Sequence, residues 1–410
     1  MSRFFIFLGL FYLLAAFYGF QAFRTAVKSP ILQIVYAFAF LAVLANIYFH
    51  FNGYDRSQGM TPAMGWSVGF FLAFMSLGFL SGAFMLIEDI FRFFSWIYRS
   101  MIADNSAASE GFPSRRKFIS QLALGLAAIP FASLLYGMYK GKYDYRVLRY
   151  TLEFDDLPES FDGYRITQIS DIHSGSFDDR NKISYAVDLI NEQNSDVILF
   201  TGDMVNSVAS EMHPWVDIFS RLKAKDGMYS VLGNHDYGDY AEWPSEEEKE
   251  ANLEELKRIQ KQIGFDLLLN ENRYLERNGE KIALVGVENW GAGGFKKAGD
   301  LARASEGVRS DDFKILLSHD PSHWEYEVLK HQDHYHLTLS GHTHGMQFGV
   351  EIPGWFKWSP AKYRYKYWAG IYQELGQYIN VNRGLGFIGY PGRVGIWPEV
   401  TVIELKKKVV

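Results

Sequence analysis

A pair of histidines near the end of the chain is the first feature of this sequence that could carry chemistry. The segment reads Ser340-Gly341-His342-Thr343-His344-Gly345 and follows the apolar run 336–339, which predicts a buried strand. Residues two apart on an extended backbone point to the same side, so both imidazoles would face one point. The flanking glycines permit a sharp turn and a close approach of another group. The pattern therefore indicates a pair of metal ligands at the end of a strand.

Four strand-like runs upstream also end in polar side chains. The runs are 164–170, 196–201, 227–232 and 312–317, and helical patterns are expected at 182–193, 211–222 and 245–262. Sites in α/β sheets lie at the carboxyl ends of strands. Taken singly, Asp171 could be a helix cap, Asn234 a turn residue and His319 a core histidine. Their joint placement favours a site, and its residues are Asp171, His173, Asp203, Asn234, His235, His319, His342 and His344.

The residue types at these strand ends indicate a particular kind of metal site. The chain has no cysteine, so thiolate ligands are excluded and the donors suit two divalent ions such as Mn, Fe, Zn or Mg. Two ions held about 3.5–4 Å apart by a bridging carboxylate clamp an in-line displacement at phosphorus and activate a water as hydroxide. A neighbouring histidine can protonate the leaving alkoxide. The sequence therefore predicts hydrolysis of a phosphate mono- or diester.

These blocks resemble the motifs of the calcineurin-like metallophosphoesterase superfamily. They occur in the same order as in that family and span roughly the last two thirds of the chain. The resemblance implies an α/β fold, a two-sheet sandwich flanked by helices. It also implies one metal held by Asp171, His173, Asp203 and His344, and a second held by Asp203, Asn234, His319 and His342. By the same resemblance His235 is the non-ligand histidine that assists the leaving group, and Asp236 orients it.

Further residues narrow the resemblance to one branch. No arginine follows 202–206 at the place that phosphoprotein phosphatases require, which counts against that activity. The segments 341–347 and 382–386, with Arg393, are similar to a bacterial branch of membrane-attached or exported phosphoesterases, which includes enzymes that cleave UDP-diacylglucosamine. Met346 stands where that branch commonly has glycine. Arg393 is either a contact to substrate phosphate or a surface residue.

The first third of the chain predicts an all-α membrane region. The runs 4–23, 31–51, 66–87 and 118–139 are long and nearly uncharged, and about 20 such residues cross a bilayer. We expect three transmembrane helices in 1–101, a basic linker in 102–117, a fourth transmembrane helix in 118–142 and the phosphoesterase domain in 143–410. Within the linker, residues 103–112 are rich in small and polar residues, which favours flexibility.

The basic residues near the spans predict which side each loop occupies. Lys and Arg gather between the first and second runs and between the third and fourth, which favours the cytoplasm for those loops. The domain and the N-terminus would then lie on the extracytoplasmic side of a multi-pass inner-membrane protein. Residues 114–119 also resemble an internal twin-arginine export signal. Ordinary positive-inside charge explains the same arginines equally well.

The expected partners are a phosphate ester and membrane lipids. The runs 355–358 and 363–368 mix aromatic with basic residues, which suits either a membrane interface or a packed loop. An interface would favour a lipid- or envelope-derived substrate. The net charge of −6 gives no nucleic-acid footprint. The alternative function is a non-enzymatic, metal-bound membrane protein in transport or assembly, although the spans hold few of the charges that an ion pathway needs.

Overall fold

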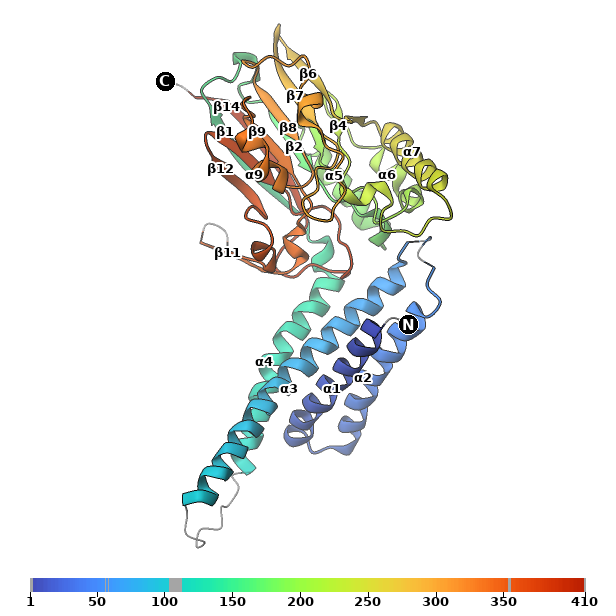
Figure 1. The fold of residues 1–410 in the computed structure, drawn as a ribbon, viewed down its shortest axis with the longest axis vertical. Coiled ribbons are helices and arrows are strands. Elements are labelled where there is room, and N and C mark those ends of the chain that lie inside the picture. The colour runs from blue at the N-terminus through green and yellow to red at the C-terminus, as the bar shows by residue number, and fades with distance from the viewer. Residues whose placement is uncertain (1–2, 56, 58, 103–112, 353–354, 409–410) are drawn as a thin grey trace. The chain divides into compact units, whose positions relative to one another are not determined.

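The computed structural model describes residues 3–55, 57, 59–102, 113–352 and 355–408 (Figure 1). The chain divides into two compact units, of which the first comprises Met1–Tyr54 and Ala63–Tyr139 and the second Asp55–Pro62 and Lys140–Val410. The boundary at Tyr139 lies close to the predicted start of the domain at 143. Residues 103–112 of the predicted linker lie outside the described residues.

The first unit consists of four long helices, α1 (Arg3–Ala26), α2 (Pro30–Phe51), α3 (Pro62–Ile102) and α4 (Pro113–Tyr139). All four are long and apolar enough to cross a membrane. Large apolar side chains such as Ile31, Phe38 and Phe49 point outward from this unit. A helix in water would turn such residues toward a core, so their exposure indicates that lipid surrounds these helices.

Small residues let α1 and α3 approach closely. A side chain added at Gly78 would meet the main chain of Ala15 at 3.1 Å, and one added at Gly19 would meet the Ser81 hydroxyl at 2.7 Å. In lipid no hydrophobic effect drives helices together, so close van der Waals packing between small residues does so instead. Gly19 and Gly78 therefore fix the contact between these two helices.

Helix α4 begins at Pro113, five residues before the predicted fourth span, so Arg115 and Arg116 are helical rather than part of a linker. The Arg116 guanidinium donates to Glu88 at 3.3 Å and to Asp89 at 2.9 Å, both on α3. About 40 Å of helix separates Pro62 from Glu88, which exceeds the ~30 Å hydrocarbon layer. The ion pairs therefore fit the edge of a membrane and join α3 to α4.

The second unit is built on two six-stranded sheets. The first has the order β1 (Arg146–Phe154), β14 (Glu399–Lys407), β2 (Arg165–Ile169), β3 (Val197–Phe200), β4 (Met228–Ser230) and β5 (Asp266–Leu267). The second has the order β12 (Gly370–Glu374), β13 (Gln377–Val381), β9 (Leu337–Ser340), β8 (Lys314–Leu317), β7 (Glu280–Gly286) and β6 (Glu271–Arg277). Strands β2 to β5 are parallel, as are β7, β8, β9 and β13. Their carboxyl ends therefore meet at one edge of each sheet.

Three apolar clusters hold the layers together. Side chains such as Leu199 and Leu317 fill the space between the sheets. The other face of the first sheet packs against α5 (Arg180–Asn191), α6 (Val216–Phe219) and α7 (Glu246–Ile263), and the other face of the second against α8 (Leu301–Ala304) and α9 (Ser322–Tyr326) (Figure 1). The predicted α/β two-sheet sandwich flanked by helices is confirmed.

Two local predictions differ from the structure. The helix expected at 211–222 is a 3-10 segment, Ala209–Trp215, followed by the single turn of α6. Pro214 explains the difference, because it has no N–H for a helical hydrogen bond and its ring disfavours the preceding turn. A separate two-stranded hairpin, β10 (Val350–Ile352) and β11 (Phe356–Trp358), was not predicted.

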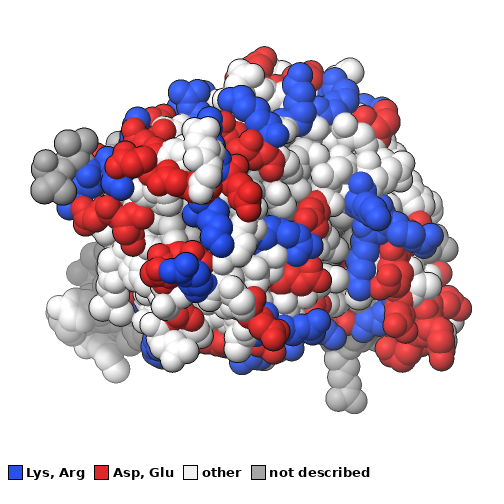
Figure 2. All heavy atoms as spheres, turned by 90° about the horizontal axis from the view of Figure 1, so that it is seen from above, with Lys and Arg blue, Asp and Glu red and all other residues white. Residues whose placement is uncertain are grey.

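Charges of both signs alternate over the face of the second unit shown in Figure 2. Opposite charges of the second unit also pair locally, as Arg273 does with Asp266 and Glu271, each at 2.9 Å. A nucleic-acid backbone requires a continuous basic stripe. Among the described residues of this face, acidic side chains interrupt the basic ones.

The interpretation of Arg115 and Arg116 as a twin-arginine signal can be tested by a substitution that keeps their positive charges. Replacing Arg115 and Arg116 together by lysine keeps both charges and removes the arginine pair that an export pathway would read. We expect this variant to place the second unit on the same side of the membrane as the parent. A single cysteine at the exposed Tyr185, labelled in whole cells with a membrane-impermeant maleimide, measures that side. Loss of labelling in the lysine variant alone would show that the signal is used.

Candidate metal centre

The two sheets are joined where their parallel strands end. The Gln168 side chain on β2 donates to the Ser340 carbonyl on β9 at 2.8 Å. The His342 amide donates to the Asp171 carboxylate at 3.0 Å, and His319 Nδ1 lies 2.6 Å from the Thr201 carbonyl. Loops after β2, β3, β8 and β9 are therefore fixed against one another.

One group of metal-ligand atoms comes from the loops after β2 and β9. Asp171, His173 and His344 are buried and offer ligand atoms that all lie within 4.8 Å of one another. His173 Nε2 is 3.0 Å from His344 Nε2, which is 3.2 Å from Asp171 Oδ1. Lone pairs that converge in this way repel unless a proton or a cation lies between them, so the donor set fits a divalent metal.

A second group lies beside the first and comes from the loops after β3, β8 and β9. It consists of Asp203, His319 and His342, again within 4.8 Å. His342 Nδ1 is 2.8 Å from Asn234 Oδ1, which adds a fourth donor. The Nε2 atom of His319 is buried and makes no hydrogen bond. It faces the Asp203 carboxylate at 3.1 Å without a well-oriented hydrogen bond, and a metal ion between the two buried groups would satisfy both.

Asp203 lies between the two groups. Its Oδ2 atom is 3.1 Å from His319 Nε2 in the second group and 3.6 Å from His173 Nε2 in the first. The structure thus brings all seven predicted ligands together. It also places Asp203 where a carboxylate could contact two ions.

The electrostatics of the site show that its buried carboxylates are stabilised by positive charge. Burial alone would raise the pKa of Asp171, yet the neighbouring His344 holds that pKa below its ordinary value. Burial opposes ionisation of Asp203 too, but His319 keeps the pKa of Asp203 well below its usual range. Burial would lower the pKa of His319, and the Asp203 carboxylate instead raises it to about 10. A proton on His319 thus supplies positive charge that the buried carboxylates require, and a metal cation could take its place.

The backbone at the site is strained. Five of the predicted ligands have φ in the left-handed region, between 48° and 71°: Asp171, His173, Asp203, His342 and His344. Such a conformation costs roughly 1–3 kcal/mol at each non-glycine residue and persists only where the surrounding structure enforces it. Its concentration on these residues indicates that the fold positions the ligands at the expense of stability.

His235 lies at the open side of the site, but its predicted contact with Asp236 is not there. The His235 Nδ1 atom is 2.6 Å from the Asn206 carbonyl, which therefore orients the ring. The Asp236 carboxylate instead accepts main-chain N–H groups of Asp203, Met204 and Gly233 at 2.7–3.0 Å. Asp236 acts as a positioning residue, because it fixes the loop that carries Asp203.

Arg393 is fully buried, which does not fit the surface role considered for it. Its Nε and Nη2 atoms donate to the carbonyls of Gly386 and Arg383 at 2.9 and 2.7 Å. Nη2 also lies 3.2 Å from His344 Nδ1. This geometry favours a role behind the ligand His344 over direct contact with substrate phosphate.

Several residues near the site were missed from the sequence. The Tyr365 hydroxyl is 2.8 Å from His342 Nε2, so it holds the ring nitrogen opposite the one facing Asn234. Tyr240 stacks on His235 with ring centroids 4.2 Å apart. The only sequence signal for Tyr365 was the aromatic and basic run 363–368, which does not distinguish a ligand's neighbour from a surface ring.

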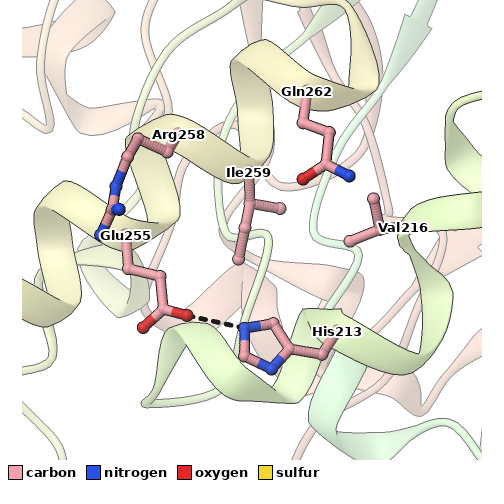
Figure 3. Close-up of a pocket in the computed structure, with 6 residues that line it drawn as sticks. All are labelled: His213, Val216, Glu255, Arg258, Ile259 and Gln262. Atoms are coloured by element: carbon pink, nitrogen blue, oxygen red, sulfur yellow. Dashed lines mark hydrogen bonds and ion pairs between the residues drawn. The ribbon is translucent and has the colours of Figure 1, made fainter.

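A separate surface groove contains another histidine (Figure 3). It lies between the 3-10 segment Ala209–Trp215 and α7, where His213 Nε2 is 2.7 Å from a Glu255 carboxylate oxygen. Both residues are exposed to solvent. An exposed pair of this kind contributes little to stability, and one imidazole with one carboxylate is a poor metal site.

Comparisons with known proteins agree with this geometry. Residues 2–142 match the family described as "Probable Calcineurin-like phosphoesterase, transmembrane domain", and residues 164–346 match "Calcineurin-like phosphoesterase". The chain is 30% identical to the uncharacterized metallophosphoesterase YkuE of Bacillus subtilis, over 72% of this chain and 98% of that one. It is 28% identical to a transmembrane protein with metallophosphoesterase domain of Danio rerio, over 75% of this chain and 66% of the relative.

The close packing at Gly341 predicts a sensitive position. A Cβ atom there would collide with the Ser170 hydroxyl and the Asp171 carboxylate, so Gly341→Ala should displace Asp171 and reduce bound metal severalfold. At Gly294 an added Cβ meets nothing within 4 Å, so Gly294→Ala is the matched control. Elemental analysis of the purified full chain measures the metal. Equal metal content in both variants would contradict this packing.

Tyr365 should tune the metal affinity through His342. Partners of ligand histidines raise affinity by orienting the ring, and removing them typically costs roughly 10-fold or more. We expect Tyr365→Phe to weaken Mn²⁺ binding by about that factor. Tyr363→Phe, an exposed neighbour in the same run, should leave it unchanged. Titration calorimetry on the metal-free full chain compares them, and equal affinities would remove Tyr365 from the site.

Proposed function

This chain belongs to the calcineurin-like metallophosphoesterase family, and on that premise we propose that it is a membrane-anchored phosphoesterase that uses two divalent ions to hydrolyse a phosphate mono- or diester. The observation that carries the proposal is the position of Asp203. Its Oδ2 atom lies within 3.6 Å of imidazole nitrogens from both donor groups. A carboxylate shared in this way is typical of two-metal hydrolytic sites.

The residues that would hold the two ions follow from the two donor groups. Asp171, His173, His344 and Asp203 would hold the first ion, and Asp203, Asn234, His319 and His342 would hold the second. The donors are nitrogen and oxygen atoms, which suit Mn, Fe, Zn or Mg. Ions bound there would neutralise charge on the phosphoryl oxygens and lower the pKa of water.

His235 is our candidate for the general acid. Its Nδ1–H is engaged by the Asn206 carbonyl, so Nε2 is left to exchange a proton with the leaving oxygen. The ring is held at right angles to His173, with centroids 4.9 Å apart, and stacked on Tyr240. Fixing the ring in this way lets the proton be transferred without reorganisation at the moment of reaction.

The accessible side of the site suggests how a phosphate ester is recognised. His235 and Tyr365 are partly exposed there, whereas the side chains of the predicted metal ligands, His342 included, are buried. The exposed Arg364 lies over the Tyr365 ring, 5.3 Å from its centroid. Its planar guanidinium can bind phosphate oxygens through two donors, so we propose Arg364 rather than Arg393 as the phosphate contact.

The location we propose is the inner membrane, with the second unit on the extracytoplasmic side. Basic residues gather at the facing ends of α3 and α4 and around the turn between α1 and α2, namely Arg92, Arg99, Arg115, Arg116, Lys117, Arg24 and Lys28. Membrane ends that carry such basic residues stay in the cytoplasm. An enzyme tethered there would meet lipid- or envelope-derived phosphate esters. Substrates of that class therefore follow the first assays with model esters.

Activity of the full chain in detergent, with and without added Mn²⁺, tests the proposal. We expect hydrolysis of p-nitrophenyl phosphate or its bis ester, lost on chelation and reduced at least about 100-fold in Asp203→Asn, because the shared carboxylate is gone. Asp217→Asn alters an exposed surface pair and is the control. A parent that binds metal but cleaves neither model esters nor lipid phosphate esters would favour the non-enzymatic alternative.

A further inference from the structure

The hairpin β10–β11 has one charged face and one apolar face. Unlike in most surface hairpins, the apolar face is the one exposed to solvent. Its register pairs Val350 with Trp358, Glu351 with Lys357, and Ile352 with Phe356. Side chains alternate between the two faces of a strand, so Glu351 and Lys357 share one face. Val350, Ile352 and Phe356 share the other.

The charged face of the hairpin is the one that contacts the domain. Glu351 accepts two hydrogen bonds from Arg383, at 2.7 and 3.0 Å, and the buried Arg383 also pairs with Glu399. On the other strand the Lys357 ammonium donates to the Ala369 carbonyl and lies 4.8 Å from the centre of the Tyr372 ring. These contacts turn the charged face of the hairpin toward the domain, with Glu351 half-buried and Lys357 at its exposed edge.

The apolar face is therefore left in solvent. Val350, Ile352 and Phe356 are 45–50% exposed, and Trp355 beside them is 81% exposed. Met346 and Phe348 extend the exposed apolar surface back along the chain toward the ligand His344. We call these six residues the insertion face: Met346, Phe348, Val350, Ile352, Trp355 and Phe356. A contiguous apolar surface of this kind marks a site of contact with an apolar partner.

Contacts within the second unit place the base of the hairpin beside Gly141, near the start of the segment Lys140–Val410. Phe348 bridges to Val394, and the Gly349 amide donates to the Val394 carbonyl at 2.9 Å. The adjoining Arg393 carbonyl packs against Gly141, which leaves no room there for a side chain. Gly141 follows Tyr139, the last residue of α4, by two residues, a span of at most about 7 Å. The base of the hairpin is thus close to the point where the chain leaves the bilayer.

We propose that the insertion face enters the interfacial layer of the lipid bilayer that α4 crosses. Tryptophan and phenylalanine side chains favour that depth, and the exposed Lys362 and Arg364 that follow the hairpin would attract anionic headgroups. Insertion turns the corner of the domain that carries His344 toward lipid headgroups. On the premise of the proposed function, the substrates that this orientation brings to the site are phosphate esters embedded in the membrane.

Because the chain has no cysteine, a single fluorophore can report the depth of the hairpin directly. Trp355→Cys in the full chain is labelled with an environment-sensitive nitrobenzoxadiazole and reconstituted in nanodiscs of phosphatidylethanolamine, phosphatidylglycerol and a doxyl-labelled lipid. The control is Leu375→Cys, at a residue 77% exposed in the turn between β12 and β13. We expect blue-shifted emission and about twofold or stronger quenching by the doxyl lipid at residue 355 relative to 375. Phe356→Cys should give the same result.

Equal quenching at residues 355 and 375, or no quenching at 355 and 356, would overturn the proposal. If the label is quenched only when one disc holds two labelled protein molecules, the insertion face instead binds a second copy of the chain. The readout needs no turnover. A failure of insertion therefore leaves the proposed hydrolysis intact, and loss of hydrolysis leaves the insertion result intact.

Discussion

The convergence of buried metal-donor atoms from two sheets is the constraint on which the rest of this structure depends. The two sheets share no strand, yet their carboxyl ends are fixed together by contacts such as Gln168 to Ser340 and His342 to Asp171. Buried carboxylates and imidazoles at that junction need a cation. The left-handed backbone of the ligands and the close packing at Gly341 are the means by which the fold holds them there.

Asp236 shows how that constraint extends beyond the ligands. Its carboxylate accepts N–H groups from two loops, so it links the strand end that carries Asp203 to the one that carries Asn234. Tyr365 and Arg393 act similarly behind His342 and His344. Each of these residues limits the movement of a metal-donor side chain.

The sequence predicted the parts of the molecule that follow from local pattern. Apolar runs followed by Asp171, Asp203 and His342 identified the strand ends. The residue types at those ends identified the metal-donor atoms. Contacts made at long range were not predictable in this way. The Asn206 carbonyl at His235, for example, depends on a loop conformation rather than a residue type. The hairpin was missed because its alternation is short and its charged face points inward, so the usual reading of polar residues as exposed does not apply.

Membrane attachment gives the domain a context that a soluble relative would lack. Four apolar helices precede it, and the hairpin β10–β11 is the part of its surface that we propose to enter the same bilayer. The central claim is nevertheless the pair of ions, and anomalous scattering from a crystal of the Mn²⁺-loaded full chain tests it most directly. The account predicts two peaks about 3.5–4 Å apart on either side of the Asp203 carboxylate. A single peak, or peaks away from Asp203, would contradict it.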